Sequence, residues 1–218
     1  EQRAKKTGKR PRGRPPTPPS GTPSDKDQVN FTDEDSRIMP VPGGGFDQAY
    51  NAQAAVDTDS LLVVAPALTQ ASSDKQQMVP MLEQLQALAP GLGRVKTLIA
   101  DAGYASEDNV NACVPAKIRP LIALGRETHH PALRQRFNEP RPLTGKPTPL
   151  EAMRHRLQTR RGRQLYALRK STVEPVFGLI KRVMKFRQFS LRGVTAARGE
   201  WNLVCLAWNL KRMNALST

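Results

Sequence analysis

Asp101 occupies a position where a carboxylate could hold a metal ion. It directly follows the apolar run from Val95 to Ala100 and precedes Gly103 by two residues. Ligands of open α/β sheets bind at the carboxyl ends of strands, so a carboxylate there is well placed for a metal. An Asp before a glycine can also accept a local turn hydrogen bond. The position alone leaves both interpretations open.

Glu174 and Lys181 are a second candidate pair. Glu174 lies three residues after Ser171, which is the spacing of a capping box, and this spacing alone favours a purely structural role for the carboxylate. Lys181 follows seven residues later, about two helical turns, so both side chains share one helix face. They could serve a metal and a phosphate, or be ordinary solvated charges.

Two basic segments could contact nucleic acid. Pro11–Pro15 matches the core of an AT-hook, in which Arg12 and Arg14 would enter the narrow minor groove of A·T-rich DNA. A generic basic linker that touches only phosphates is the alternative. The run from Arg154 to Lys170 contains many cations and few acids within helical reach, which favours phosphate contacts over a merely solvated face.

The charge of the 218-residue chain is uneven along the sequence. The formal net charge is +15, which suits a polyanionic partner and argues against an enzyme acting on a small molecule. Residues 17–116 carry five basic and thirteen acidic side chains, whereas residues 117–170 carry fourteen basic and three acidic ones. An acidic centre between basic segments suits an enzyme that holds DNA around carboxylates better than a coating protein.

Several classes of protein are excluded by simple patterns. No apolar run reaches the roughly 18 residues of a membrane span, and the basic N-terminal segment does not lead into the apolar core of a signal peptide. Cys113 and Cys205 have no CxxC spacing, and the three histidines form no HExxH pattern. We therefore expect neither a zinc site nor a disulfide framework, no membrane partner, and a cytoplasmic, nucleoid-associated protein.

The first two thirds of the chain predict a mixed α/β sheet. Residues 1–31 are rich in Pro and Arg and are predicted to be a disordered linker. After them the periodicity predicts, in order, strands at 50–56 and 61–68, a helix at 75–89 capped by Ser73 or Asp74, a strand at 95–100, a helix ending near 116 and a strand at 119–124. This β-β-α-β-α-β order places a carboxylate at one strand end.

The remainder is predicted to be helical after an irregular segment. Residues 125–150 lack an apolar period and indicate a loop or inserted lid. A basic helix over 151–169 and an amphipathic helix over 172–187 follow. The last helix, over 195–213, is apolar on most faces, so we expect it to be buried with Trp201 and Trp208 as its bulk.

Two of these motifs together resemble a known family. Ile99–Tyr104 is similar to the "ADxGY" strand end of bacterial insertion-sequence DDE transposases, and Tyr166, Arg169, Glu174 and Lys181 resemble their Tyr–Arg–Glu–Lys signature. The interval from Glu174 to Lys181 is that of the family. Four residues separate Arg169 from Glu174 where three are usual, and Lys170 occupies the usual position. The similarity extends over residues 32–213.

The resemblance implies an RNase H-like catalytic domain over residues 32–213, with a basic loop and helix inserted at about 125–170. It implies a D-D-E triad that holds two Mg²⁺ ions for cleavage and strand transfer of DNA, the transposon ends and the target being the partners. Asp101 would be the second Asp and Glu174 the Glu of this triad. Tyr166, Arg169 and Lys181 would grip phosphates, and the enzyme would act as a homodimer.

One element of the family pattern is missing. No Asp-bearing strand precedes Tyr50, and Asp57, which ends the first predicted strand, is one candidate substitute for the first Asp. The alternative is that the chain is the C-terminal part of a transposase, which would bind Mg²⁺ weakly and be inactive alone. Two other functions stay open: a non-catalytic DNA-binding protein with an AT-hook-like arm, and an RNase H-like nuclease that hydrolyses without joining.

Overall fold

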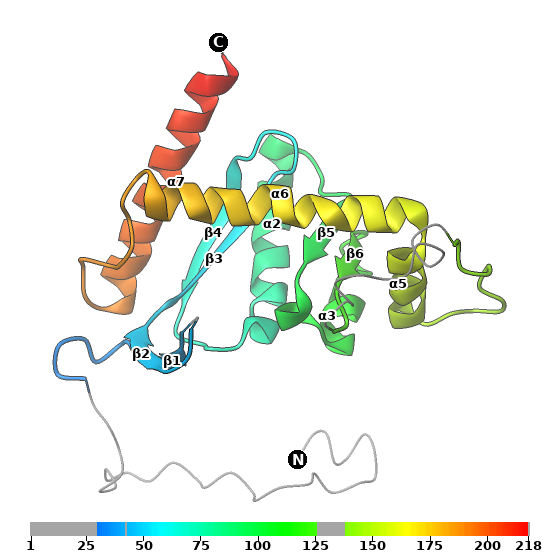
Figure 1. Ribbon diagram of the computed structural model, residues 1–218, viewed down its shortest axis with the longest axis horizontal. Coiled ribbons are helices and arrows are strands. Elements are labelled where there is room, and N and C mark those ends of the chain that lie inside the picture. Colours follow the sequence, from blue (N-terminus) through cyan, green and yellow to red (C-terminus); the bar gives the residue numbers. More distant parts are fainter. Residues whose placement is uncertain (1–29, 42, 126–137, 218) are drawn as a thin grey trace, which may run out of the picture.

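The computed structural model describes residues 30–41, 43–125 and 138–217 (Figure 1). The predicted linker, apart from its last two residues, and the AT-hook-like Arg12 and Arg14 lie outside this range. The elements, in chain order, are β1 (Arg37–Pro40), β2 (Phe46–Ala49), β3 (Asn51–Val56), β4 (Val63–Thr69), η1 (Asp74–Gln76), α2 (Met78–Leu92), β5 (Thr97–Ala100), η2 (Ala102–Tyr104), α3 (Glu107–Ala112), β6 (Arg119–Ile122), α5 (Pro149–Gln158), α6 (Arg160–Arg182) and α7 (Val194–Leu216).

The strands of the described residues form three separate pairs. β1 and β2 are antiparallel, β3 and β4 are antiparallel, and β5 and β6 are parallel. From β3 to β6 the order of the main elements is the predicted β-β-α-β-α-β, so the mixed α/β class is confirmed. The predicted single RNase H-like sheet differs from what is observed, because β3 and β5 share no ladder within the described chain.

The β1–β2 hairpin is the element that the sequence did not predict. Both strands are largely exposed and lack the apolar alternation that marks a half-buried strand. Between them Gly43, Gly44 and Gly45 all have φ between 93° and 99°, which glycine adopts without strain. This glycine run turns the chain inside a hairpin, whereas the first strand expected from the sequence begins only at residue 50.

Each half of the divided sheet has its own hydrophobic core, and α6 contacts both halves. The first core packs β3 and β4 against α6 and α7, around Trp201 and Trp208. The second packs β5 and β6 against α2, α3 and α5, around Ile122 and Met153. Because α6 crosses over β3 and β5 and contacts both, it holds the two halves in one body (Figure 1).

The helix boundary predicted near Ser171 is wrong. α6 runs unbroken from Arg160 to Arg182, and the break lies at Thr159, whose side chain accepts a hydrogen bond from the Gly162 N–H at 3.0 Å. The Ser171 hydroxyl instead donates to the carbonyl of Leu168 within the helix at 3.1 Å, which removes the expected cap. A complete capping box is present at Thr148 and Glu151, at the start of α5.

The last helix is only half buried, which corrects the expectation of a fully buried element. Trp201 and Trp208 are 2% and 4% exposed and pack against β3 and β4, as predicted. Since the hairpin covers one face only, the opposite face shows a stripe of large apolar side chains that are each more than half exposed, namely Leu203, Leu206, Leu210 and Met213. Among the helices described, none is long and apolar enough to cross a membrane.

Asp33 ties the N-terminal hairpin region to α7. Its carboxylate accepts hydrogen bonds from the Tyr50 hydroxyl at 2.8 Å and from the Gly193 N–H at 3.1 Å, where α7 begins. Burial opposes ionisation of Asp33, but these hydrogen bonds outweigh it and lower the pKa of the carboxyl. The charged form is therefore the one that the folded chain stabilises.

We predict that Asp33→Asn reduces the free energy of unfolding at neutral pH and that the reduction disappears in acid. A lowered pKa contributes stability above the unfolded value near 3.9, and this contribution is lost as the pH falls through the folded pKa. Urea unfolding between pH 7 and pH 3 measures the difference. Asp47→Asn, an exposed carboxylate on β2, is the control; an effect of Asp33→Asn that is independent of pH would contradict the assignment.

We predict that Gly162→Ala destabilises the chain, whereas Gly178→Ala in the same helix does not. A Cβ on Gly162 would overlap the carbonyl oxygen of Arg156, so the break between α5 and α6 would have to move, at a cost of about 1–3 kcal/mol. A Cβ on Gly178 meets nothing within 4 Å, and alanine there should stabilise the helix by up to about 1 kcal/mol. Thermal unfolding of both variants measures the change in stability, and an equal change for both would contradict the overlap at Gly162.

Candidate active site

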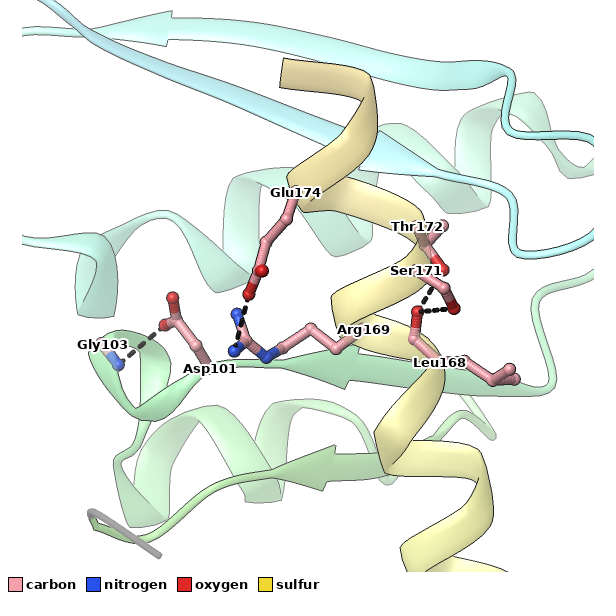
Figure 2. Close-up of polar contacts among 7 residues, drawn as sticks. All are labelled: Asp101, Gly103, Leu168, Arg169, Ser171, Thr172 and Glu174. Carbon is pink, nitrogen blue, oxygen red and sulfur yellow. Dashed lines mark hydrogen bonds and ion pairs between the residues drawn. The ribbon is translucent and has the colours of Figure 1, made fainter. Parts of the chain in front are cut away.

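Asp101 lies at the carboxyl end of β5, as predicted. It is the N-cap of η2, and its Oδ1 accepts the N–H of Gly103 at 2.8 Å. One carboxylate oxygen of Asp101 thus makes the local turn hydrogen bond that the sequence allowed. The other oxygen points away from the Gly103 N–H (Figure 2). Asp101 can therefore hold its own loop and still offer an oxygen to a ligand.

Asp74 is a second carboxylate at this position, and the sequence analysis considered it only as a helix cap. A Cβ built on Gly103 would lie 2.9 Å from Asp101 Oδ1 and 2.9 Å from Asp74 Oδ2, so the two carboxylates are close neighbours. Asp74 Oδ1 accepts the side-chain amides of Asn51 and Gln53, both at 2.8 Å. Its position after strand β4, mirroring that of Asp101 after β5, is the signal that could have identified it.

The buried amide of Gln53 joins the two acidic loops. Its Nε2 donates to Asp74, its Oε1 accepts from the Tyr104 hydroxyl, and its main-chain carbonyl accepts the Trp201 indole N–H at 3.0 Å. Burial, and then the charges of Asp74 and Asp101, raise the pKa of Tyr104, so its hydroxyl stays a donor. The loops after β4 and β5 are thereby fixed relative to β3 and α7.

Glu174 reaches the site from α6 and is held by Arg169. Arg169 Nη2 and Glu174 Oε1 are 3.0 Å apart, and the side chains are 24% and 54% exposed. Figure 2 shows Glu174 pointing to the guanidinium, while the carboxylate of Asp101 is turned toward Gly103. Arg169 is thus the cation paired with Glu174, and Lys170, the alternative in the sequence analysis, is exposed beside it.

The remaining predicted site residues lie around this group without joining it. Lys181 is exposed near the C-terminal end of α6, on the same face as Glu174. Tyr166 is half-buried, one turn before Arg169. Asp57 accepts from Ser60 at the far end of β3, about 13 Å along the strand from Gln53, so the structure does not bring it to Asp101.

The side-chain types at this position are those that bind a hard divalent cation. Asp74, Asp101 and Glu174 supply carboxylate oxygens, the ligands that Mg²⁺ prefers, and no His or Cys lies among them. Among the described residues no three His, Cys, Asp or Glu side chains are grouped closely enough to hold a metal. Glu174 would have to exchange Arg169 for the ion, and an ion pair this exposed contributes only about 0–1 kcal/mol.

Comparison with known proteins identifies the family of this fold. A family model described as a transposase DDE domain matches residues 30–210. No curated protein and no solved structure matches the chain. The match includes both acidic loops, Asp101 and the whole of α6.

We predict that Gly103→Ala destabilises the chain and that loss of the Asp74 carboxylate relieves part of the cost. The added methyl group would press on both carboxylates, which should cost about 1–3 kcal/mol. In an Asp74→Ser background one of the two obstructing oxygens is gone, so the cost should fall. A double-mutant cycle by urea unfolding measures this coupling, and strictly additive effects would show that the two carboxylates do not meet at Gly103.

Proposed function

Because the chain belongs to the transposase DDE-domain family, we propose that it catalyses metal-dependent cleavage of DNA at the ends of an insertion sequence and transfer of those ends to a target. We include in the proposal an RNase H-like arrangement of its strands. The observation that supports it is that Asp101, at the carboxyl end of β5, and Glu174, on α6, lie in the same region of the fold within the matched residues (Figure 2).

Asp101 and Glu174 would hold Mg²⁺ in this proposal. Two such ions, when bound, activate the attacking water or 3′-hydroxyl and stabilise the leaving oxygen. Asp101 can offer the oxygen that its turn leaves free, and Gln53 and Tyr104 keep its loop from moving. Glu174 is ion-paired with Arg169; if Glu174 held a metal ion, the Arg169 guanidinium would be available to contact a DNA phosphate.

The cations of α5 and α6 support a path for DNA along these helices. α6 has 23 residues and is therefore about 35 Å long. Tyr166 and Arg169 lie in its middle and Lys181 near its end, where they would contact phosphates. Further exposed cations on α5 and α6 are Arg154, Arg160, Arg161, Lys170 and Arg182. Few acids lie among them, so this surface suits a polyanion.

The homodimer and the nucleoid location are part of this proposal on the strength of the family resemblance. Sedimentation velocity of the purified chain, alone and with DNA carrying element ends, tests the first. Cell fractionation with nuclease treatment tests the second.

We predict that Asp101→Asn abolishes metal-dependent strand transfer, with a loss of at least about 100-fold, and leaves DNA affinity within about twofold. The substitution removes a metal ligand without altering the basic surface of α6. Joining of a pre-cleaved, end-labelled DNA in Mg²⁺ measures the activity, and gel shift measures affinity. Asp108→Asn, exposed on α3, is the control.

Two other results would support a different function. A chain that binds DNA but has no metal-dependent activity to lose would be a DNA-binding protein only. Hydrolysis without joining would indicate a nuclease.

We predict that Lys181→Gln weakens DNA binding for all sequences alike and makes it less dependent on salt. Each lost phosphate contact should reduce the slope of log affinity against log salt by about 0.9. Lys211→Gln on α7, an exposed lysine away from α6, should leave the slope unchanged. Fluorescence anisotropy over a salt series compares the two variants, and equal slopes would exclude Lys181 from the DNA path.

A further inference from the structure

A basic cavity lies at the end of the β5–β6 pair that is opposite to Asp101. It has a volume of about 830 Å³ and is lined by the C-terminal part of α2, the residues before β5 and the turn that leads into β6. Lys96 precedes β5 and Asp101 follows it, so about 17 Å of strand separates the cavity from the candidate active site. Four lining residues are exposed cations, namely Arg94, Lys96, Lys117 and Arg119. No Asp or Glu is among the described residues that line it.

These four cations have no acidic partner in the described part of the chain. The ion pair that the described residues form, between Arg169 and Glu174, involves none of them. Surface cations are commonly interspersed with acids, and like charges that gather without acids repel one another. The pKa of Arg156 on α5 reflects this repulsion, because burial lowers it and the charge of Arg119 lowers it further. An anion bound at the cavity would relieve the repulsion.

Attraction to the ends of helices explains only part of this cluster. The C-terminus of a helix attracts positive charge, but the effect falls off within the last turn. Arg94 lies two residues after the end of α2 and benefits from it. Lys96 and Arg119 lie at the starts of strands, and Lys117 is five residues beyond the end of α3. The gathering of all four therefore needs a second cause.

Lys117 has a backbone conformation that is unfavourable for lysine. Its φ is 56°, and its N–H donates to the Val114 carbonyl at 3.0 Å in the turn after α3. Glycine is the usual residue at such a left-handed position, because a side chain is strained there. The chain thus carries a lysine side chain at the cavity where glycine would suit the backbone better. Strain of this kind is typical of positions whose side chain binds a ligand.

We propose that this cavity binds backbone phosphates of DNA. The cations specify a phosphate-rich ligand, and the inference rests on the proposed function in taking DNA as that ligand. Arg94 and Arg119 would donate several N–H groups to phosphate oxygens, and Lys96 and Lys117 would act as point charges. The site is separate from the cations of α6 and extends the contact with DNA to the amino ends of β5 and β6.

Modification of lysines in the presence of DNA tests the location. The wild-type chain is acetylated with and without a saturating double-stranded oligonucleotide, in EDTA so that no cleavage occurs, and mass spectrometry measures the rate at each lysine. With DNA, Lys96 and Lys117 should react several-fold more slowly, because their ammonium groups are held against phosphates. Lys211 on α7, which is exposed and lies outside the cavity lining, should react at an unchanged rate.

Lys117→Gly changes stability and DNA binding in different directions. Because it relieves the left-handed backbone, the midpoint of thermal unfolding should stay the same or rise. The slope of log affinity against log salt should fall by about 0.9, which corresponds to one lost phosphate contact. Lys117→Arg keeps the charge and should keep the slope. Lys185→Gly, at a lysine with φ of 63° outside the cavity lining, is the control for the effect of the backbone on stability.

Three results would overturn the proposal. They are unchanged modification of Lys96 and Lys117 at saturating DNA, an unchanged salt slope in folded Lys117→Gly, and equal protection by tripolyphosphate at the same concentration of phosphate groups. The last result would assign the cavity to a small phosphate compound instead.

The same experiment separates this site from the DNA path on α6. Slower modification of Lys181 without that of Lys96 and Lys117 would support the path on α6 and reject the cavity. Slower modification of Lys96 and Lys117 without that of Lys181 would support the cavity and reject the path. The two proposals therefore fail separately.

Discussion

The arrangement of the site depends on one buried amide. Gln53 is 4% exposed and has bonds to the loop after β4, to the loop after β5 and to α7. Its side-chain amide makes the bonds to the two loops and its main-chain carbonyl accepts the bond from α7; each buried group left without its partner would typically cost about 1–3 kcal/mol. The network therefore has one geometry in which all groups are satisfied, and that geometry sets Asp74 beside Asp101.

The second constraint is the continuity of α6. Because this helix rests on both halves of the divided sheet, the register of its residues fixes where Glu174 stands relative to β5. Arg169, five residues earlier, then forms an ion pair with Glu174 and fixes the direction in which its carboxylate points. Because the pair is partly exposed, it contributes only about 0–1 kcal/mol, and either partner can exchange it for another ion at little cost.

The sequence predicted those features that are set by local patterns. The apolar strand before Asp101 and the helical stripe around Val176 and Ile180 were visible because burial follows periodicity. The break between α5 and α6 was misplaced, because it depends on the close approach of Gly162 to Arg156, whereas the capping spacing at Ser171 is satisfied inside a helix. Asp74 was missed because its meeting with Asp101 is a tertiary contact between two loops.

The exposed apolar stripe of α7 makes the solubility of the chain depend on salt. At low ionic strength the net charge of +15 keeps copies apart and leaves Leu203, Leu206 and Leu210 in water. Salt shortens the reach of this repulsion to about 8 Å at physiological strength, while sulfate and similar ions strengthen apolar attraction. Buffers of high ionic strength therefore favour contacts between copies of the chain through α7 and lower its solubility.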